Sequence, residues 1–331
     1  MPDACQPVPE LPLALPAERF ELQTTAGRVS VYRAAPETGA EPVDAAAAPP
    51  TDLPPLLLVH SVNAAASAAE VAPLFAHYRR TRAVYALDLP GYGFSDRSDR
   101  AYTPRLMTDA LLAVLAHISS QHGGAGVDVL GVSLSSEFVA RAQREAPDAV
   151  RRIALVSPTG FSGARRRYGP PGSTRGVPWL HRWLTRPAWS GGLFNTLTRP
   201  GVVRYFLQRT WGGKQIDETL WRYCVLTARQ SGAKHAPLYF LSAHLFSADI
   251  NTVYEALDCP VWVSMATRGD FTDYRGRRTV QGRANWQFHR LEGGALPYFE
   301  SPAAFTAALD PFWPLMPFFR SKVPVVLIDW S

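Results

Sequence analysis

The chain has few cysteines, no long apolar run and, over one long stretch, no acidic residue. Its three cysteines are scattered and odd in number, so we expect reduced thiols in a cytoplasmic protein. They lack metal-ligand spacing, so we expect no metal site. We also expect no cofactor. No apolar run reaches the roughly 18–20 residues of a membrane helix. The first residues carry no basic group before a short apolar stretch, so we expect no signal peptide.

Acidic residues are absent from residues 149–216, although twelve arginines and lysines fall between Arg151 and Lys214. The same stretch contains four tryptophans. One interpretation is a solvated basic face over an aromatic core. The other is a weak contact with an anionic membrane surface or an acidic ligand. No nucleic-acid-binding motif accompanies the charge, so we expect no nucleic-acid partner.

What the sequence does contain is a regular alternation of short apolar runs and helical patterns. Residues 19–36 carry two alternating segments around Ala-Gly, which predicts a hairpin. The runs at 53–60, 83–90, 127–132 and 150–158 are mostly apolar, as is typical of strands buried on both faces. The fold class that follows is α/β, with a mostly parallel sheet and helices on both faces.

The alternation stops after Pro158 for about a hundred residues and resumes with strand patterns at 259–267 and 285–293. An insertion of this kind predicts a helical cap over the strand ends. The expected division is therefore an N-terminal hairpin and Ala/Pro-rich linker (1–52), a core (53–159 and 256–314), a helical cap (160–255) and an apolar C-terminal arm (315–331).

Residues 130–136, LGVSLSS, follow the third buried run directly. A serine on a sharp turn between strand and helix needs small neighbours, because the two backbones approach closely there. Gly131 meets this need on one side of Ser133, and Ser135 and Ser136 meet it on the other. The pattern is typical of a nucleophile elbow, in which the Leu134 N–H at the start of the helix faces an oxyanion.

Three stretches together resemble the capped α/β-hydrolase proteins, a group that includes esterases, C–C bond hydrolases and epoxide hydrolases. LLLVHSVNA (56–64) is similar to the strand that leads into the oxyanion loop. YALDLPGYGFSD (85–96) is similar to the D-x-P-G-x-G-x-S loop of that family, and VLGVSLSS (129–136) to its nucleophile elbow. The resemblance covers about residues 17–158 and 256–314.

The resemblance implies roles for particular residues. Ser133 corresponds to the nucleophile, and the backbone N–H groups of Val62 and Leu134 correspond to the oxyanion hole. Asp270, in VSMATRGDFTDY, corresponds to the acid of the triad. His60 corresponds to a histidine that is mostly structural in such proteins.

The basic residue of the triad is missing. The family places a histidine in a G-x-G-H-x-P-x-x-E stretch, and EGGALPYFE puts Ala295 at that position. Three other histidines are candidates for a base. His289 is the one beyond Asp270 in the chain, and His235 and His244 come from the predicted cap.

Three functions remain open for a fold with an incomplete catalytic triad. The first, and the one that we expect, is hydrolysis of an ester-like or C–C bond in an apolar small molecule by Ser133 with a non-standard base. The second is a lyase or isomerase reaction that uses the oxyanion hole and needs no full triad. The third is a catalytically inactive protein that binds a ligand or a partner. A serine without its base loses on the order of 10⁴–10⁶ in rate.

Overall fold

The computed structural model describes residues 9–36, 53–163 and 165–313. The predicted Ala/Pro-rich linker falls mostly on residues 37–52, and the predicted C-terminal arm on 315–331. Both lie outside the described residues.

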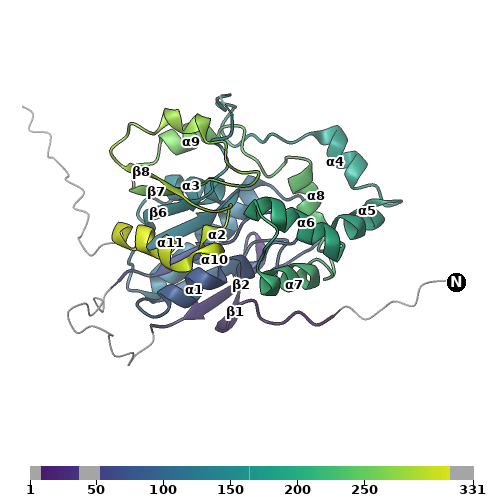
Figure 1. The fold of residues 1–331 in the computed structure, drawn as a ribbon, viewed down its shortest axis with the longest axis horizontal. Helices are drawn as coiled ribbons and strands as arrows, with labels where there is room; N and C mark the ends of the chain where they lie inside the picture. Colours follow the sequence, from purple (N-terminus) through teal and green to yellow (C-terminus); the bar gives the residue numbers. More distant parts are fainter. Residues whose placement is uncertain (1–8, 37–52, 164, 314–331) are drawn as a thin grey trace, which may run out of the picture.

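A single eight-stranded sheet forms the centre of the protein (Figure 1). Its strands are β1 (Glu18–Thr24), β2 (Gly27–Ala34), β3 (Leu56–Val59), β4 (Val84–Asp88), β5 (Val127–Val132), β6 (Val150–Val156), β7 (Val261–Ala266) and β8 (Trp286–Leu291). They lie in the order β1-β2-β4-β3-β5-β6-β7-β8. The β2 strand is antiparallel to both of its neighbours, and all pairs from β4 to β8 are parallel.

Helices cover both faces of this sheet, which is why most residues of its central strands are apolar. One face carries α1 (Ala72–Tyr78), α10 (Pro297–Glu300) and α11 (Pro302–Leu309), and the other carries α2 (Pro104–Gln121), α3 (Ser135–Glu145) and α9 (Ile250–Glu255). Along β5, Val129 packs in the core under α2 and α3, whereas Leu130 packs in the core under α1 and α11.

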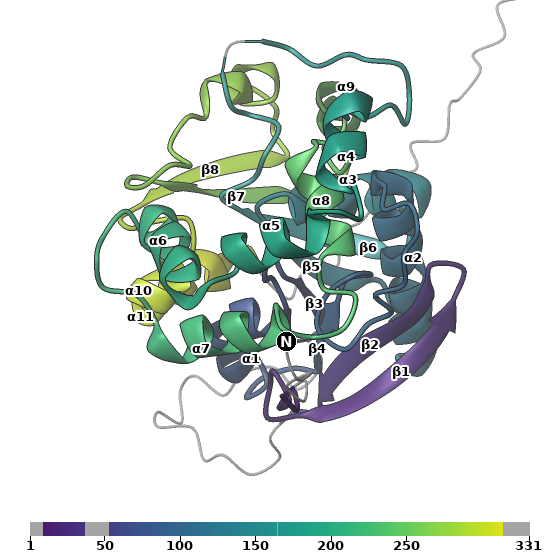
Figure 2. The same cartoon turned by 90° about the vertical axis from the view of Figure 1, so that its right-hand side faces the viewer.

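The inserted segment forms a layer of helices over one end of the strands. This layer faces the viewer in Figure 2. Its helices are α4 (Pro178–Leu184), α5 (Ser190–Leu197), α6 (Pro200–Trp211), α7 (Glu218–Thr227) and α8 (His235–Leu241). Loops that follow strands contact it. Arg97, after β4, donates hydrogen bonds to the carbonyl and hydroxyl oxygens of Thr227 at 2.8 Å each. The layer therefore covers the carboxyl ends of the strands.

These observations confirm the predicted fold class, a mostly parallel sheet with helices on both faces and an inserted helical cap. One helix of the inserted segment lies elsewhere. The α9 helix falls within the range expected for the cap, residues 160–255, but it packs against α3 on a face of the sheet.

The D-x-P-G-x-G-x-S loop, residues 88–95, forms hydrogen bonds within itself and with the segment that follows β3. The Asp88 carboxylate accepts hydrogen bonds from the backbone N–H groups of Ala68 and Phe94 at 2.8 and 2.9 Å, and the Ser95 hydroxyl donates to the Asp88 carbonyl. Gly93 has φ +49°, and a Cβ there would lie 1.9 Å from the Asp88 carboxyl carbon. The loop therefore needs glycine at this position for two reasons, its left-handed backbone and its contact with Asp88.

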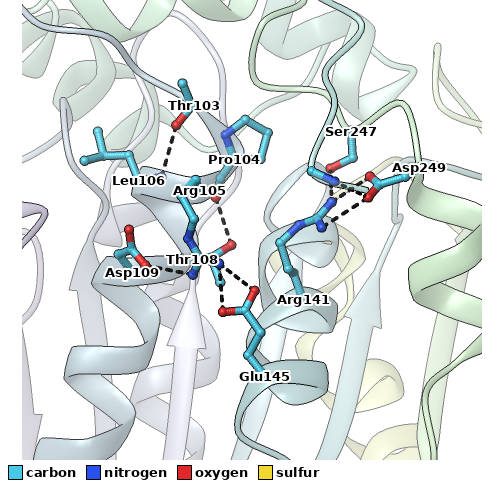
Figure 3. Close-up of polar contacts among 11 residues, drawn as sticks. Thr103, Pro104, Arg105, Leu106, Thr108, Asp109, Arg141, Glu145, Ser247 and Asp249 are labelled. Carbon is cyan, nitrogen blue, oxygen red and sulfur yellow. Dashed lines mark hydrogen bonds and ion pairs between the residues drawn. The ribbon is translucent and has the colours of Figure 1, made fainter. Parts of the chain in front are cut away.

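Ion pairs hold α3 against its neighbours (Figure 3). Arg105 of α2 lies between Asp109, at 2.7 Å, and Glu145 of α3, at 2.6 Å. Arg141 of α3 reaches Asp249, just before α9, at 2.7 Å. The helix that follows the predicted nucleophile is thus tied on both sides.

A buried ion pair joins the amino ends of three strands. The Arg82 guanidinium, just before β4, lies 2.5 Å from the Asp128 carboxylate of β5, and both side chains are 1% exposed. Arg82 also donates through Nε to the carbonyl of Pro54, which precedes β3, at 2.7 Å.

Removal of Arg82 should therefore be costly. We expect Arg82→Met to lower the free energy of unfolding by about 3–5 kcal/mol, because the Asp128 carboxylate stays buried without its main partner. Urea unfolding followed by tryptophan fluorescence measures this change. The exposed Arg80→Met change should cost less than about 0.5 kcal/mol, and a loss below about 1 kcal/mol for Arg82→Met would contradict the prediction.

Candidate functional site

The Ser133 backbone has the geometry of a nucleophile elbow. Ser133 joins β5 to α3 with φ +54°, in the left-handed region that costs a non-glycine residue about 1–3 kcal/mol. Its N–H donates to the carbonyl of Val156 at 2.8 Å, which holds the turn against β6. The side chain is half-buried, and within the described residues its hydroxyl has no hydrogen-bond partner.

The small residues around the turn are explained by close packing. A Cβ on Gly131 would lie 3.1 Å from the Val139 side chain. Ser135, which stands where the family has glycine, is fully buried, and its hydroxyl donates to the carbonyl of His60 at 2.5 Å. The extra hydroxyl therefore ties the elbow to the loop after β3.

His60 has the bonding of a structural residue. Its Nε2 accepts a hydrogen bond from the Leu89 N–H at 2.9 Å, which leaves the proton on Nδ1, and Nδ1 donates to the carbonyl of Ser61 at 2.5 Å. Both ring nitrogens of this buried histidine are occupied, so it is not placed to accept the proton of Ser133.

A buried carboxylate organises the loop after β3. Glu70, which is 2% exposed, accepts a hydrogen bond from the Ser61 N–H at 2.8 Å and from the Asn63 amide at 2.7 Å. The sequence contains a hint of this residue, since SAAE at 67–70 has the spacing of a capping box. In the structure Glu70 turns away from the helix end and supports the loop instead.

Val62 and Leu134, the predicted oxyanion residues, are both buried. Within the described part of the chain, neither backbone N–H donates a hydrogen bond to another protein group. Unpaired N–H groups in buried residues are rare, because the lost hydrogen bond with water is not replaced. Both groups are thus available to an acceptor from outside the chain.

Asp270, the predicted acid, is held by the cap. Arg209 of α6 binds it through two hydrogen bonds, Nε to Oδ2 at 2.5 Å and a terminal nitrogen to Oδ1 at 2.7 Å. The hydrogen bonds that Arg209 donates to Asp270 and to the Tyr205 hydroxyl raise the pKa of its guanidinium, which stays charged. Both oxygens of Asp270 therefore face a permanent cation. Sequence reasoning did not identify Arg209, because the pair joins residues 61 positions apart.

Ala295, at the position of the missing histidine, also contacts α6. Its N–H donates to the carbonyl of Thr210 at 2.9 Å, and the residue is buried. A Cβ on the preceding Gly294 would lie 2.4 Å from the Thr210 oxygen and 2.5 Å from the Cα of Trp211. The carboxyl end of the cap helix is thus pressed directly against the loop on which the family carries its base.

The three candidate histidines each have other partners. His289 stacks on Trp262, with ring centroids 5.1 Å apart, and its position in β8 is in register with Ser264 of β7. It therefore stands three strands from β5, about 14 Å across the sheet. His235 lies 3.2 Å from the carboxylate of Asp99.

His244 lies within the cap, where its Nδ1 is 2.9 Å from the Ser242 hydroxyl and its ring is 5.1 Å from that of His181. Burial lowers the pKa of all three candidates, His235, His244 and His289. None of them shares a hydrogen bond with Ser133 in the described residues.

A second buried carboxylate lies one turn along α3 from the elbow. Glu137 accepts hydrogen bonds from the Thr159 hydroxyl at 2.6 Å and from the Ser247 N–H at 2.8 Å, and burial raises its pKa. The Thr159 N–H in turn donates to the Ser133 carbonyl at 3.3 Å. Glu137 thus links the elbow to the segment that returns from the cap.

Three surface cavities lie elsewhere. They have volumes of about 510, 610 and 320 Å³ and are lined mainly by cap residues or by loops beside the cap, and Ser133 lines none of them. In the ranges 9–36, 53–163 and 165–313, no group of three histidine, cysteine or acidic side chains is placed to hold a metal. In the same ranges, no helix is long and apolar enough to cross a membrane.

Comparison with known proteins places this geometry in context. A model of the alpha/beta hydrolase family matches residues 56–309. No curated protein matches the chain. Many solved structures do. Three examples, whose activities differ from one another, are described next.

A thermophilic esterase from Thermogutta terrifontis is 18% identical, with a TM-score of 0.62 over 89% of this chain and 98% of that one. The enol-lactonase from Burkholderia xenovorans is 14% identical, with a TM-score of 0.64 over 88% and 99%. An epoxide hydrolase is 18% identical, with a TM-score of 0.65 over 90% and 99%. At these identities the likeness shows the fold alone.

The buried Glu137 predicts a dependence of stability on pH. Because its pKa is raised above the ordinary value of 4.5, the folded chain keeps the proton to higher pH than the unfolded chain. Its stabilising contribution is therefore full below pH 4.5 and is lost as the pH rises through the raised pKa.

Glu137→Gln removes this titration. The melting temperature of the variant minus that of the natural chain should increase from about pH 4.5 upward and then level off. Thermal unfolding across the pH range measures the difference, with the exposed Glu292→Gln as the matched control. A difference that does not change with pH would contradict the prediction.

Proposed function

We propose, from the premise that the chain belongs to the alpha/beta hydrolase family, that it binds a small apolar molecule with a carbonyl group at Ser133 and does not hydrolyse it through a Ser-His-Asp triad. In this proposal the carbonyl oxygen accepts hydrogen bonds from the N–H groups of Val62 and Leu134. The ligand lies beneath the cap.

The observation that carries the proposal is that α6 of the cap binds both of the other two triad positions, Asp270 and Ala295. Asp270 is bound by Arg209, and the loop of Ala295 is bound by the carbonyl of Thr210. Both contacts come from the carboxyl end of α6. In this arrangement the two positions hold the cap on the core. Neither of them is free to accept the proton of Ser133 or to orient a base.

The size of the missing effect supports the same conclusion. General-base assistance contributes about 10²–10⁴ in rate, and loss of a triad member reduces turnover further, to what oxyanion stabilisation and binding alone supply. Two N–H groups without internal partners still favour a carbonyl or oxyanion in the site.

A second candidate is favoured by the strained backbone of Ser133. A left-handed serine is costly to hold, and such strain is concentrated at functional sites. In this reading Ser133 attacks an ester-like or C–C bond with a base from outside the triad, for which His235, His244 and His289 are the candidates. A lyase or isomerase reaction, in which the oxyanion hole holds an enolate, needs no such base.

Labelling with a fluorophosphonate probe separates the first two candidates. For the binding function we expect no Ser133-dependent labelling, and hydrolysis of p-nitrophenyl butyrate within about tenfold of the Ser133→Ala variant, because no base activates the hydroxyl. Labelling that disappears in Ser133→Ala would overturn this proposal in favour of a hydrolase. Alanine variants of the three histidines would then identify its base.

The role of α6 predicts how activity could be restored. Ala295→His alone should change p-nitrophenyl butyrate hydrolysis by less than about tenfold, because Arg209 keeps Asp270 occupied. Together with Arg209→Ala, the same change should raise the rate by about 10²–10⁴. The gain should vanish when Ser133→Ala is added. A full gain from Ala295→His alone would mean that Arg209 does not restrict Asp270.

A further inference from the structure

The acid-free stretch of the sequence remains largely unneutralised after folding. Three of its arginines find acidic partners outside the stretch, Arg151 with Asp128, Arg204 with Glu218 and Arg209 with Asp270. Arg182, Arg186 and Arg199 form no salt bridge within the described residues. Of these three, Arg182 lies on α4, Arg186 lies between α4 and α5, and Arg199 lies between α5 and α6.

Two of the most exposed large apolar side chains lie in the same place. Trp179 and Trp183 are one turn apart on α4 and are 65% and 48% exposed. Trp183 contacts Trp189, with ring centroids 5.7 Å apart, and Arg186 lies over the Trp189 ring at 5.3 Å. Arginine between exposed indoles is the composition of a surface that meets a polar–apolar boundary.

A cation-lined cavity of about 510 Å³ lies between α5 and the start of α8. Arg199, Arg229 and Lys234 line it, and no acidic residue does. Lys234 lies 3.4 Å from the hydroxyl of Ser190, the residue after Trp189. The cavity thus lies beside the residue that follows Trp189. The helices α4, α5 and α8 lie together on the side of the protein that faces the viewer in Figure 2.

We propose that this surface docks on a bilayer containing anionic phospholipid. Trp179 and Trp183 enter the headgroup region, and the cavity of Arg199, Arg229 and Lys234 receives a lipid phosphate. The charge of the surface is complementary to such a membrane and would repel a second copy of the chain. Basic side chains near an anionic leaflet each strengthen binding about fivefold, and interfacial indoles add apolar contact.

Co-sedimentation with vesicles tests the proposal. We expect binding to phosphatidylcholine vesicles with about 30% phosphatidylglycerol, much weaker binding to phosphatidylcholine alone, and a steep loss when salt rises from about 0.1 to 0.5 M. Arg182→Gln with Arg186→Gln should weaken binding about 25-fold. Arg199→Gln with Arg229→Gln and Lys234→Gln should weaken it at least as much.

Matched variants separate the contributions of the side chains. Trp179→Ser with Trp183→Ser should weaken binding at least tenfold and leave the melting temperature unchanged, since both residues are exposed. Phe271→Ser and Arg80→Gln remove an exposed aromatic and an exposed cation outside the cap, and they should leave vesicle binding unchanged.

Three results would overturn the proposal. The first is equal binding to neutral and anionic vesicles. The second is no vesicle binding together with binding of inorganic phosphate that the triple cavity variant abolishes, which would assign the cavity to a free anion. The third is salt-dependent binding to single-stranded RNA with no preference for anionic vesicles, which would assign the surface to nucleic acid.

Discussion

The carboxyl end of α6 packs against the loops after β7 and β8, and these contacts fix the two loops in position. Arg209 holds Asp270, the Thr210 carbonyl holds the N–H of Ala295, and the Asp270 N–H donates back to the Arg209 carbonyl at 3.3 Å. Close backbone contacts accompany these bonds, because Gly294 leaves room for Thr210 and Trp211. In the family these loops bear the acid and the base of the triad. In this chain the same loops bind helix α6 of the cap.

This arrangement explains why a chain without the triad histidine still keeps the surroundings of the nucleophile. The elbow is held by hydrogen bonds that do not involve the missing residue. Ser133 is anchored to β6, Ser135 to the carbonyl of His60, and the oxyanion loop to the buried Glu70. These contacts do not involve position 295, so the turn keeps the left-handed backbone of Ser133 without a histidine there.

Charge is distributed between the two parts of the chain in a way that suits different tasks. In the core, two arginines with little exposure pair with buried carboxylates, Arg82 with Asp128 and Arg141 with Asp249. In the cap, the exposed Arg182, Arg186 and Arg199 have no acidic partner within the described residues, and α4 also carries the exposed Trp179 and Trp183. The cost of burying an unpaired charge explains the first pattern, and full hydration of exposed arginines permits the second.

Local patterns in the sequence were sufficient for the fold. Mostly apolar runs predicted β3 to β6, because strands buried on both faces admit few polar residues. Strand patterns after the inserted segment predicted β7 and β8, and alternation predicted the hairpin. The motifs located Ser133 on its strand-to-helix turn, since that turn depends on small residues close in sequence. The same alignment identified Ala295, because a missing histidine is visible in the sequence itself.

Only the tertiary structure decided what occupies the other positions of the site. Arg209 and Asp270 are 61 residues apart, and no local pattern relates them. Glu70 matched a helix-capping motif, but its position beside the oxyanion loop depends on how β3 and the following turn pack. The partners of His235, His244 and His289 were equally hidden, since they arise from cap folding and sheet register. Contacts between distant segments depend on packing of the whole chain, and for that reason the sequence alone left the choice of base open.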